Sequence, residues 1–137
     1  MKTRTMLQGF EWNLPEDSKH WVRLEKKTAE LAELGFTDVW MPPAYKGIGG
    51  AGDVGYGVYD LYDLGEFDQK DTIATKYGTL DQYISLVRSM HSAGVNVLAD
   101  IVLNHKMGAD YVERVLAEMY YPERRKTGYK LTKKITA

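Results

Sequence analysis

The stretch Val95-Asn96-Val97-Leu98-Ala99-Asp100-Ile101-Val102-Leu103-Asn104-His105 decides the fold that we predict for this chain. Its odd positions from Val95 to Leu103 are all apolar, and the side chains of a strand alternate between the two faces of a sheet. We therefore expect a buried strand with one face packed on helices, ending in Asp100, Asn104 and His105. Ligands of parallel α/β folds bind at the carboxyl ends of strands, so these side chains are candidates for a site. A hydrogen-bonded network that caps the strand is the alternative.

Composition limits the classes of function. The chain has 137 residues, with 18 Lys and Arg against 19 Asp and Glu, so its net charge of −1 predicts no bulk attraction to nucleic acid or membrane. It has no cysteine, and hence no disulfide framework. The first residues lack the apolar segment of a secretory signal, and no apolar run approaches the roughly 20 residues that cross a bilayer. We expect a soluble, cytoplasmic protein.

The periodicity of apolar residues predicts a β-α-β-α-β order. The expected elements are a strand at 6–12, a helix from 17 or 18 to 34, a strand at 37–41, a helix at 79–93 and the strand at 95–105. Thr79 and Gln82 form a capping box before the second helix, and Gly35 and Gly94 stop the two helices. This order implies an α/β fold with a parallel sheet and right-handed crossovers.

The segment 44–78 is too long for a simple connection, since loops beyond roughly 12–15 residues are usually functional or disordered. Its many tyrosines favour an ordered, functional loop. Within it, Gly47-Ile48-Gly49-Gly50-Ala51-Gly52 fits the G-x-G-x-x-G pattern of dinucleotide binding. That mechanism requires a helix to begin at the glycines directly after a strand, whereas here Pro42 and Pro43 intervene and no helical stripe follows. The pattern therefore does not predict a nucleotide site.

Four blocks of sequence, in order over residues 5–110, resemble the alpha-amylase family, glycoside hydrolase family 13. They are Gln8-Gly9-Phe10-Glu11-Trp12, Val39-Trp40-Met41-Pro42-Pro43-Ala44-Tyr45-Lys46, Gly55-Tyr56-Gly57-Val58-Tyr59-Asp60-Leu61-Tyr62-Asp63, and Asp100-x-x-x-Asn104-His105. The likeness is nearest to the bacterial liquefying and cytoplasmic-type enzymes. It implies the first part, about three strands and two helices, of a (β/α)8 TIM barrel, which takes about 250 residues in full. Residues 1–108 would belong to the barrel, and 109–137 would begin an inserted β-rich domain.

The resemblance also implies roles for individual residues. Tyr56 would stack on the sugar beside the scissile bond, and His105 would hydrogen-bond that sugar. Asp100 would support the catalytic carboxylates in the barrel mouth, and Trp12 would line the glucan cleft. Asn104 would be a ligand of a structural calcium ion, only part of whose site lies in this chain, because an amide oxygen suits a hard cation. Core packing is the alternative for the two aromatic residues.

The function implied is an alpha-amylase fragment. The full-length enzyme would cleave internal α-1,4 bonds of starch, glycogen and maltooligosaccharides by a retaining mechanism, which uses two carboxyl groups about 5 Å apart. In the family these groups come from later strands, so we expect no catalytic residue in this chain and no activity from it alone. The alternatives are another clan member, maltogenic or glucan-transferring, or a noncatalytic α/β sugar-binding domain.

The last segment gives two conflicting signals. Tyr111, Val112, Val115, Leu116 and Met119 follow a helical period and predict a third helix packed on the sheet. The resemblance predicts β structure at the same place, as part of the inserted domain. Residues 120–137 are basic, which is typical of a solvated face.

Overall fold

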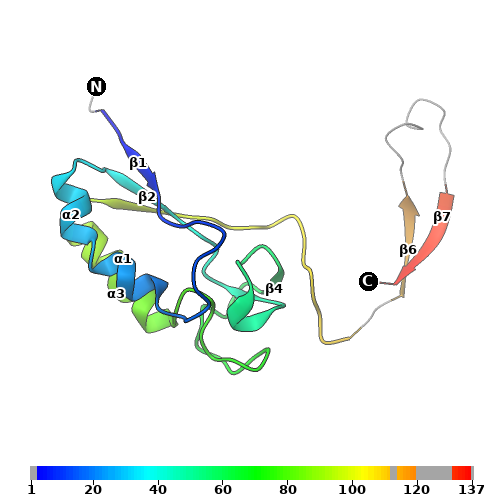
Figure 1. Cartoon of the computed structure of the whole chain (residues 1–137). Helices are drawn as coiled ribbons and strands as arrows, with labels where there is room; N and C mark the ends of the chain where they lie inside the picture. The colour runs from blue at the N-terminus through cyan, green and yellow to red at the C-terminus, as the bar shows by residue number, and fades with distance from the viewer. Residues whose placement is uncertain (1–2, 112–113, 120–130, 137) are drawn as a thin grey trace.

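The computed structural model describes residues 3–111, 114–119 and 131–136. Figure 1 shows the elements in chain order: β1 (Met6–Gln8), α1 (His20–Glu25), α2 (Thr28–Glu33), β2 (Asp38–Met41), β3 (Lys46–Gly47), the 3₁₀ turn η1 (Gly50–Gly52), β4 (Val58–Asp60), α3 (Leu80–Ser92), β5 (Asn96–Ala99), β6 (Arg114–Met119) and β7 (Leu131–Thr136). The described part of the chain is therefore α/β, as predicted.

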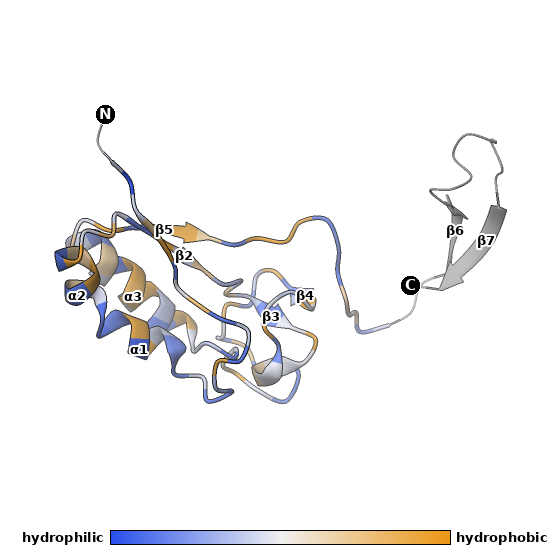
Figure 2. Ribbon diagram, turned by 45° about the horizontal axis from the view of Figure 1, so that its top comes forward, coloured by the Kyte–Doolittle hydropathy of each residue, from blue (hydrophilic) through white to orange (hydrophobic). Residues whose placement is uncertain are grey.

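Three parallel strands form the sheet, in the order β1-β2-β5. Val39 at the centre of β2 pairs with Leu7 on one side and with Val97 on the other. The helices α1, α2 and α3 lie together on one face of this sheet (Figure 1). The apolar residues of β2 and β5 stand out in Figure 2, as expected for strands that bury a face against helices.

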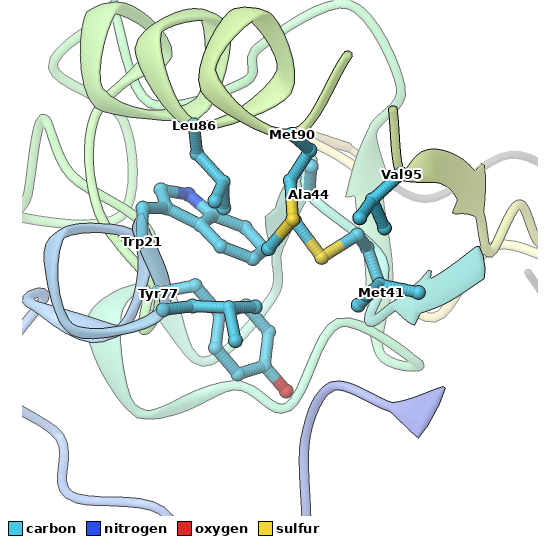
Figure 3. Close-up of a cluster of buried hydrophobic side chains, with 9 residues drawn as sticks. Trp21, Met41, Ala44, Tyr77, Leu86, Met90 and Val95 are labelled. Carbon is cyan, nitrogen blue, oxygen red and sulfur yellow. The ribbon is translucent and has the colours of Figure 1, made fainter. Parts of the chain in front are cut away.

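A single apolar core fills the space between helices and sheet. Trp21 of α1 packs against Tyr77 with ring centroids 5.2 Å apart, and Leu86 and Met90 of α3 close over them (Figure 3). Trp21, Leu86 and Met90 have no exposed surface. Their burial, rather than helix propensity, stabilises such short helices.

Asp38 ties the amino ends of the three strands together. Its carboxylate accepts hydrogen bonds from the Arg4 guanidinium, from the Thr37 hydroxyl at 2.6 Å and from the Asn96 amide at 3.1 Å. These bonds, the one from Arg4 above all, hold the pKa of Asp38 well below its usual range. The network fixes the strands relative to one another at the edge opposite Asp100.

The prediction of one continuous first helix is wrong. We expected one helix up to Leu34, and the structure has two short ones, α1 and α2. Between them the Lys27 N–H bonds the carbonyl of Leu24, three residues back, at 3.0 Å, and this tighter turn interrupts the helix. Leu34 is 68% exposed, so it lies outside the core.

The start of that helix is also later than predicted. The carboxylate of Asp17 accepts the N–H of Lys19 at 3.1 Å, which is an Asx turn rather than a helix cap. Ser18 has a φ of +54°, and α1 begins only at His20.

The helix α3 confirms its prediction. The Gln82 N–H donates to the Thr79 hydroxyl at 3.4 Å, and the Thr79 N–H donates to the Gln82 side chain at 3.1 Å. This is the complete capping box that the sequence predicted. Gly94 follows the helix with a φ of +77°, the left-handed conformation that favours glycine.

Two strands are shorter than predicted. The first ends at Gln8 rather than Trp12, and the central one spans Asn96–Ala99 rather than the whole stretch to His105. Among the described strands, β5 pairs only with β2, so its far edge is uncovered. Ile101 and Leu103 are accordingly 58% and 79% exposed, and the prediction that they are buried is wrong.

In the last segment the helix predicted from periodicity is wrong, and β structure, as the resemblance predicts, is present. Arg114–Met119 is the strand β6, which pairs antiparallel with β7. Backbone pairing with a second strand has overridden the helical spacing of the apolar residues. The domain boundary after residue 108 stays a prediction, and the basic residues 120–130 lie outside the described residues.

The long loop between β2 and α3 is ordered around a buried charge. Lys46 and Asp63 have fully buried side chains, with Nζ 3.3 Å from Oδ2. The ammonium also donates to backbone carbonyls of Phe67 (3.1 Å), Thr72 (2.6 Å) and Ile73 (2.7 Å). A surface loop is thereby fixed from inside by one lysine.

Truncation of a core side chain tests this packing. We expect Leu86→Ala to lower the free energy of unfolding by about 3 kcal/mol, because it removes buried methyl groups and leaves a cavity. Leu34→Ala, at an exposed position, is the matched control and is expected to change it by less than about 0.5 kcal/mol. Urea unfolding measures both. Equal losses would contradict the assignment of Leu86 to the core.

Removal of the buried ammonium tests the loop. We expect Lys46→Met to lower the free energy of unfolding by about 3–5 kcal/mol, because Asp63 would keep a buried charge without its partner. Lys27→Met is the control, since it breaks the exposed Lys27–Glu30 pair, which contributes little. If both variants unfold at the same urea concentration as the unsubstituted chain, the loop does not depend on Lys46.

Candidate functional site

Asp100 lies at the carboxyl end of the sheet, directly after β5. The loop that follows β2 brings Tyr56 to it, and the Tyr56 hydroxyl donates to Asp100 Oδ2 at 2.7 Å. These two residues are 44 positions apart, and they meet because parallel strands end at the same edge. Burial, and then the hydrogen bond to Asp100, raise the pKa of Tyr56 to about 12. The phenol is therefore a donor at every physiological pH.

The Trp12 ring stacks on the Tyr56 ring. It comes from the turn after β1, and the two rings are nearly parallel, with an interplanar angle of 5° and centroids 6.2 Å apart. Trp12 is 65% exposed. Beside the pair is a hollow of about 510 Å³, lined by Trp12, Gly49, Gly52, Asp53, Val54, Tyr56, Gly57 and Met107. An exposed aromatic face over a hollow suits the apolar face of a sugar ring.

His105 contacts Tyr56 through the Tyr56 backbone carbonyl. Its Nε2 lies 3.0 Å from the Tyr56 carbonyl oxygen, and its Nδ1 lies 3.1 Å from the Asn104 amide nitrogen. The amide donates to Nδ1, so Nε2 carries the proton and donates to the carbonyl. Both ring nitrogens are thus bonded within the protein. A sugar hydroxyl that binds His105 would have to replace one of these bonds.

The structure brings together all five residues singled out in the sequence. Trp12, Tyr56, Asp100 and His105 are connected through stacking or hydrogen bonds that include Tyr56, and Asn104 joins them through His105. Neither aromatic residue belongs to the apolar core around Trp21, although Tyr56 packs against a second, smaller cluster of Tyr45, Val58 and Val102.

Tyr45 is a supporting residue whose role the sequence did not reveal. Its hydroxyl accepts the N–H of Val102 at 2.8 Å, and its side chain is buried. Burial is the main cause of the raised pKa of Tyr45. The bond holds the segment after β5 against the loop, and so it keeps Asp100 and His105 on the same side.

The glycine-rich segment binds a carboxylate of its own chain. Asp53 accepts N–H groups of Gly49 (3.1 Å), Gly55 (2.8 Å) and Gly57 (3.2 Å). The glycines form the 3₁₀ turn η1, and the next element along the chain is the strand β4 rather than a helix. The Gly49 amide, within the segment that fits the nucleotide pattern, is therefore occupied by a carboxylate of the same chain. The sequence signal that could have revealed this arrangement is the cluster of glycines on both sides of Asp53.

The described side chains do not complete a metal site. No group of three or more His, Cys, Asp or Glu side chains is arranged to hold a metal ion within the described residues. Asn104 is exposed and uses its amide nitrogen for His105, which leaves its oxygen, a suitable donor to a hard cation, directed elsewhere. One such ligand does not bind calcium on its own. In the same described residues, no helix is long and apolar enough to cross a membrane.

Comparisons with known proteins agree with this geometry. A family model described as alpha amylase, catalytic domain, matches residues 23–133. An alpha-amylase of Bacillus licheniformis is 58% identical over 113 residues, covering 82% of this chain and 22% of the relative. The cytoplasmic alpha-amylase of Escherichia coli (strain K12) is 46% identical over 115 residues, covering 84% of this chain and 23% of the relative. The structure of truncated alternansucrase from Leuconostoc mesenteroides NRRL B-1355 matches with a TM-score of 0.69 at 26% identity, covering 82% of this chain and 11% of that one.

The fold and the family match define part of an α/β catalytic domain. The chain belongs to the alpha-amylase family, whose catalytic-domain model covers most of its length. It spans less than a quarter of the length of the two amylases named above.

The raised pKa of Tyr56 gives a titration test. In the unfolded chain a tyrosine ionises near its ordinary value of 10.0, whereas Tyr56 in the folded chain ionises near 12. Its contribution to stability is therefore fully present below pH 10 and is lost as the pH rises towards 12. In a phenolate absorbance titration, Tyr56→Phe should remove one ionisation at the alkaline end. Loss of an ionisation near pH 10 would contradict the Tyr56–Asp100 hydrogen bond.

Proposed function

We propose that this chain is the N-terminal part of an alpha-amylase that cleaves internal α-1,4 bonds of starch, glycogen and maltooligosaccharides. The observation that carries the proposal is the meeting of Trp12, Tyr56, Asp100 and His105 at the carboxyl edge of a parallel sheet, in a chain of this family. The three strands and their helices would be the first part of a (β/α)8 barrel, in which this edge forms the mouth.

In this proposal the residues of the chain bind and orient the substrate. The rings of Tyr56 and Trp12 would receive the apolar face of a glucose unit, and Asp100 would accept hydrogen bonds at the barrel mouth. His105 would exchange one of its present bonds for a sugar hydroxyl. The nucleophile and the general acid of a retaining mechanism would come from later strands of the full-length enzyme, and these residues alone would be inactive.

The same proposal includes a structural calcium ion and a cytoplasmic location. Asn104 would give one oxygen ligand to a structural calcium ion, with the remaining ligands from other parts of the full-length enzyme. Bound calcium would stabilise the segment after β5. The similarity to an Escherichia coli enzyme described as cytoplasmic supports the proposal that this protein acts in the cytoplasm.

A second candidate is another activity of the same clan, maltogenic or glucan-transferring. The observation in its favour is a relative named glucan 1,4-alpha-maltohexaosidase from Bacillus sp. (strain 707), which is 52% identical over 121 residues. The products formed from one defined maltooligosaccharide separate the candidates. A mixture of short products indicates an endo-acting hydrolase, a single product length indicates a maltogenic enzyme, and longer products indicate transfer.

The test is release of reducing ends from soluble starch, with calcium present. We expect release by the full-length protein that carries this sequence and none by the isolated chain. In the full-length protein, Tyr56→Ala should lower kcat/KM about tenfold, because the mutation removes both the buried area of the ring and the about 0.5–1.5 kcal/mol that aromatic stacking adds to it, and about 1.4 kcal/mol corresponds to a factor of ten.

Tyr62→Ala is the matched control, because Tyr62 is on the same loop and is 88% exposed. Turnover by the isolated chain would overturn the assignment of the catalytic carboxylates to later strands. Saturable binding of maltooligosaccharides by the full-length protein with no cleavage would favour the noncatalytic alternative.

A further inference from the structure

The carboxylate of Asp53 is enclosed by glycines. Its two oxygens accept the backbone N–H groups of Gly49, Gly55 and Gly57, at 2.8–3.2 Å. A Cβ at Gly47 would lie 2.2 Å from Asp53 Cγ, and a Cβ at Gly57 would lie 2.3 Å from its Oδ2. These two glycines are therefore required by the carboxylate itself, since no larger residue leaves room for it.

Two of the three bonded amides stand on either side of Tyr56. Gly55 and Gly57 both donate to Asp53 Oδ1, so one oxygen fixes the backbone before and after the tyrosine. The Tyr56 carbonyl is held by His105 and its hydroxyl by Asp100. Bonds to ionised acceptors are about twice as strong as neutral ones, so Asp53 is the strongest restraint on this backbone.

We propose that Asp53 is a positioning residue for Tyr56, and that its charge sets the angle at which the Tyr56 ring meets a sugar. The proposal rests on the proposed function, in which Tyr56 is the stacking platform. In this proposal Asp53 acts through its bonds to the backbone on both sides of Tyr56. Two glycines of the segment that fits the nucleotide pattern thus have a different role: Gly47 leaves room for the Asp53 carboxylate, and Gly49 donates to it.

The proposal depends on how precisely the Tyr56 ring must be positioned for the reaction. A misplacement of about 1 Å by a group outside the chemistry can lower a rate by about 10²-fold. Asp53→Asn keeps the size of the side chain but removes its charge, and it turns an amide group towards N–H donors. One of the three bonds would be lost, and the backbone around Tyr56 would relax.

A double-mutant cycle in the full-length enzyme tests this inference. We expect Asp53→Asn to lower kcat/KM on a maltooligosaccharide about tenfold when Tyr56 is present, and less than twofold in a Tyr56→Ala background. Asp60→Asn is the matched control, because Asp60 accepts the N–H of Tyr62 at 2.9 Å in the same loop. Equal losses from Asp53→Asn in both backgrounds would overturn the proposal, since Asp53 would then act through general stability.

A second measurement does not depend on turnover. Hydrogen exchange of the Gly55 and Gly57 amides, followed in the same protein, should be at least tenfold faster in Asp53→Asn than in Asp60→Asn. If Asp53→Asn fails to fold, Gly57→Ala replaces it in this experiment, because the added methyl group would displace the Asp53 carboxylate. Gly57→Ala should accelerate exchange of the Gly55 amide in the same way. Unchanged exchange would overturn the positioning role. An inactive unsubstituted enzyme with this exchange pattern would instead contradict the proposed function and leave the link between Asp53 and Tyr56 supported.

Discussion

The contact between Lys46 and Asp63 is the constraint on which the site depends. Both side chains are fully buried, and the ammonium replaces the water that would otherwise solvate the loop carbonyls. A buried pair of this kind contributes little net stability, but the loss of either partner is costly, and this makes one loop conformation much more favourable than its alternatives. The loop begins directly after β2, so its fixed conformation delivers Tyr56 to Asp100.

The carboxyl edge of the sheet, where the candidate site lies, is therefore built from the parallel strands and from the loop after β2. The sheet places the end of β5 beside the end of β2, through parallel pairing over four residues. The loop adds what a sheet cannot supply, which is an aromatic surface above the strand ends. Tyr45 connects the two by holding the Val102 backbone after β5, and Asp53 holds the loop backbone around Tyr56.

The sequence predicts those parts of the structure that depend on local signals. The capping box of Thr79 and the parallel order follow from neighbouring residues and from periodicity, and both are present. The break at Lys27 was missed because the apolar period of the helix continues through the local turn that interrupts it. Periodicity alone predicted a helix at β6, where pairing with the distant strand β7 gives the β structure that the resemblance predicted. The site residues were predicted through family likeness. Asp53 was missed because its partners are backbone amides, which leave no mark on the sequence except glycine.

The most direct test of the central claim is a crystal structure of the full-length protein with a bound maltooligosaccharide. We predict a glucose ring stacked on Tyr56, with its hydroxyls within hydrogen-bond distance of Asp100 and His105. Density for the sugar at another surface, with Tyr56 and Trp12 still stacked and bare, would contradict the assignment of this edge as the glucan site.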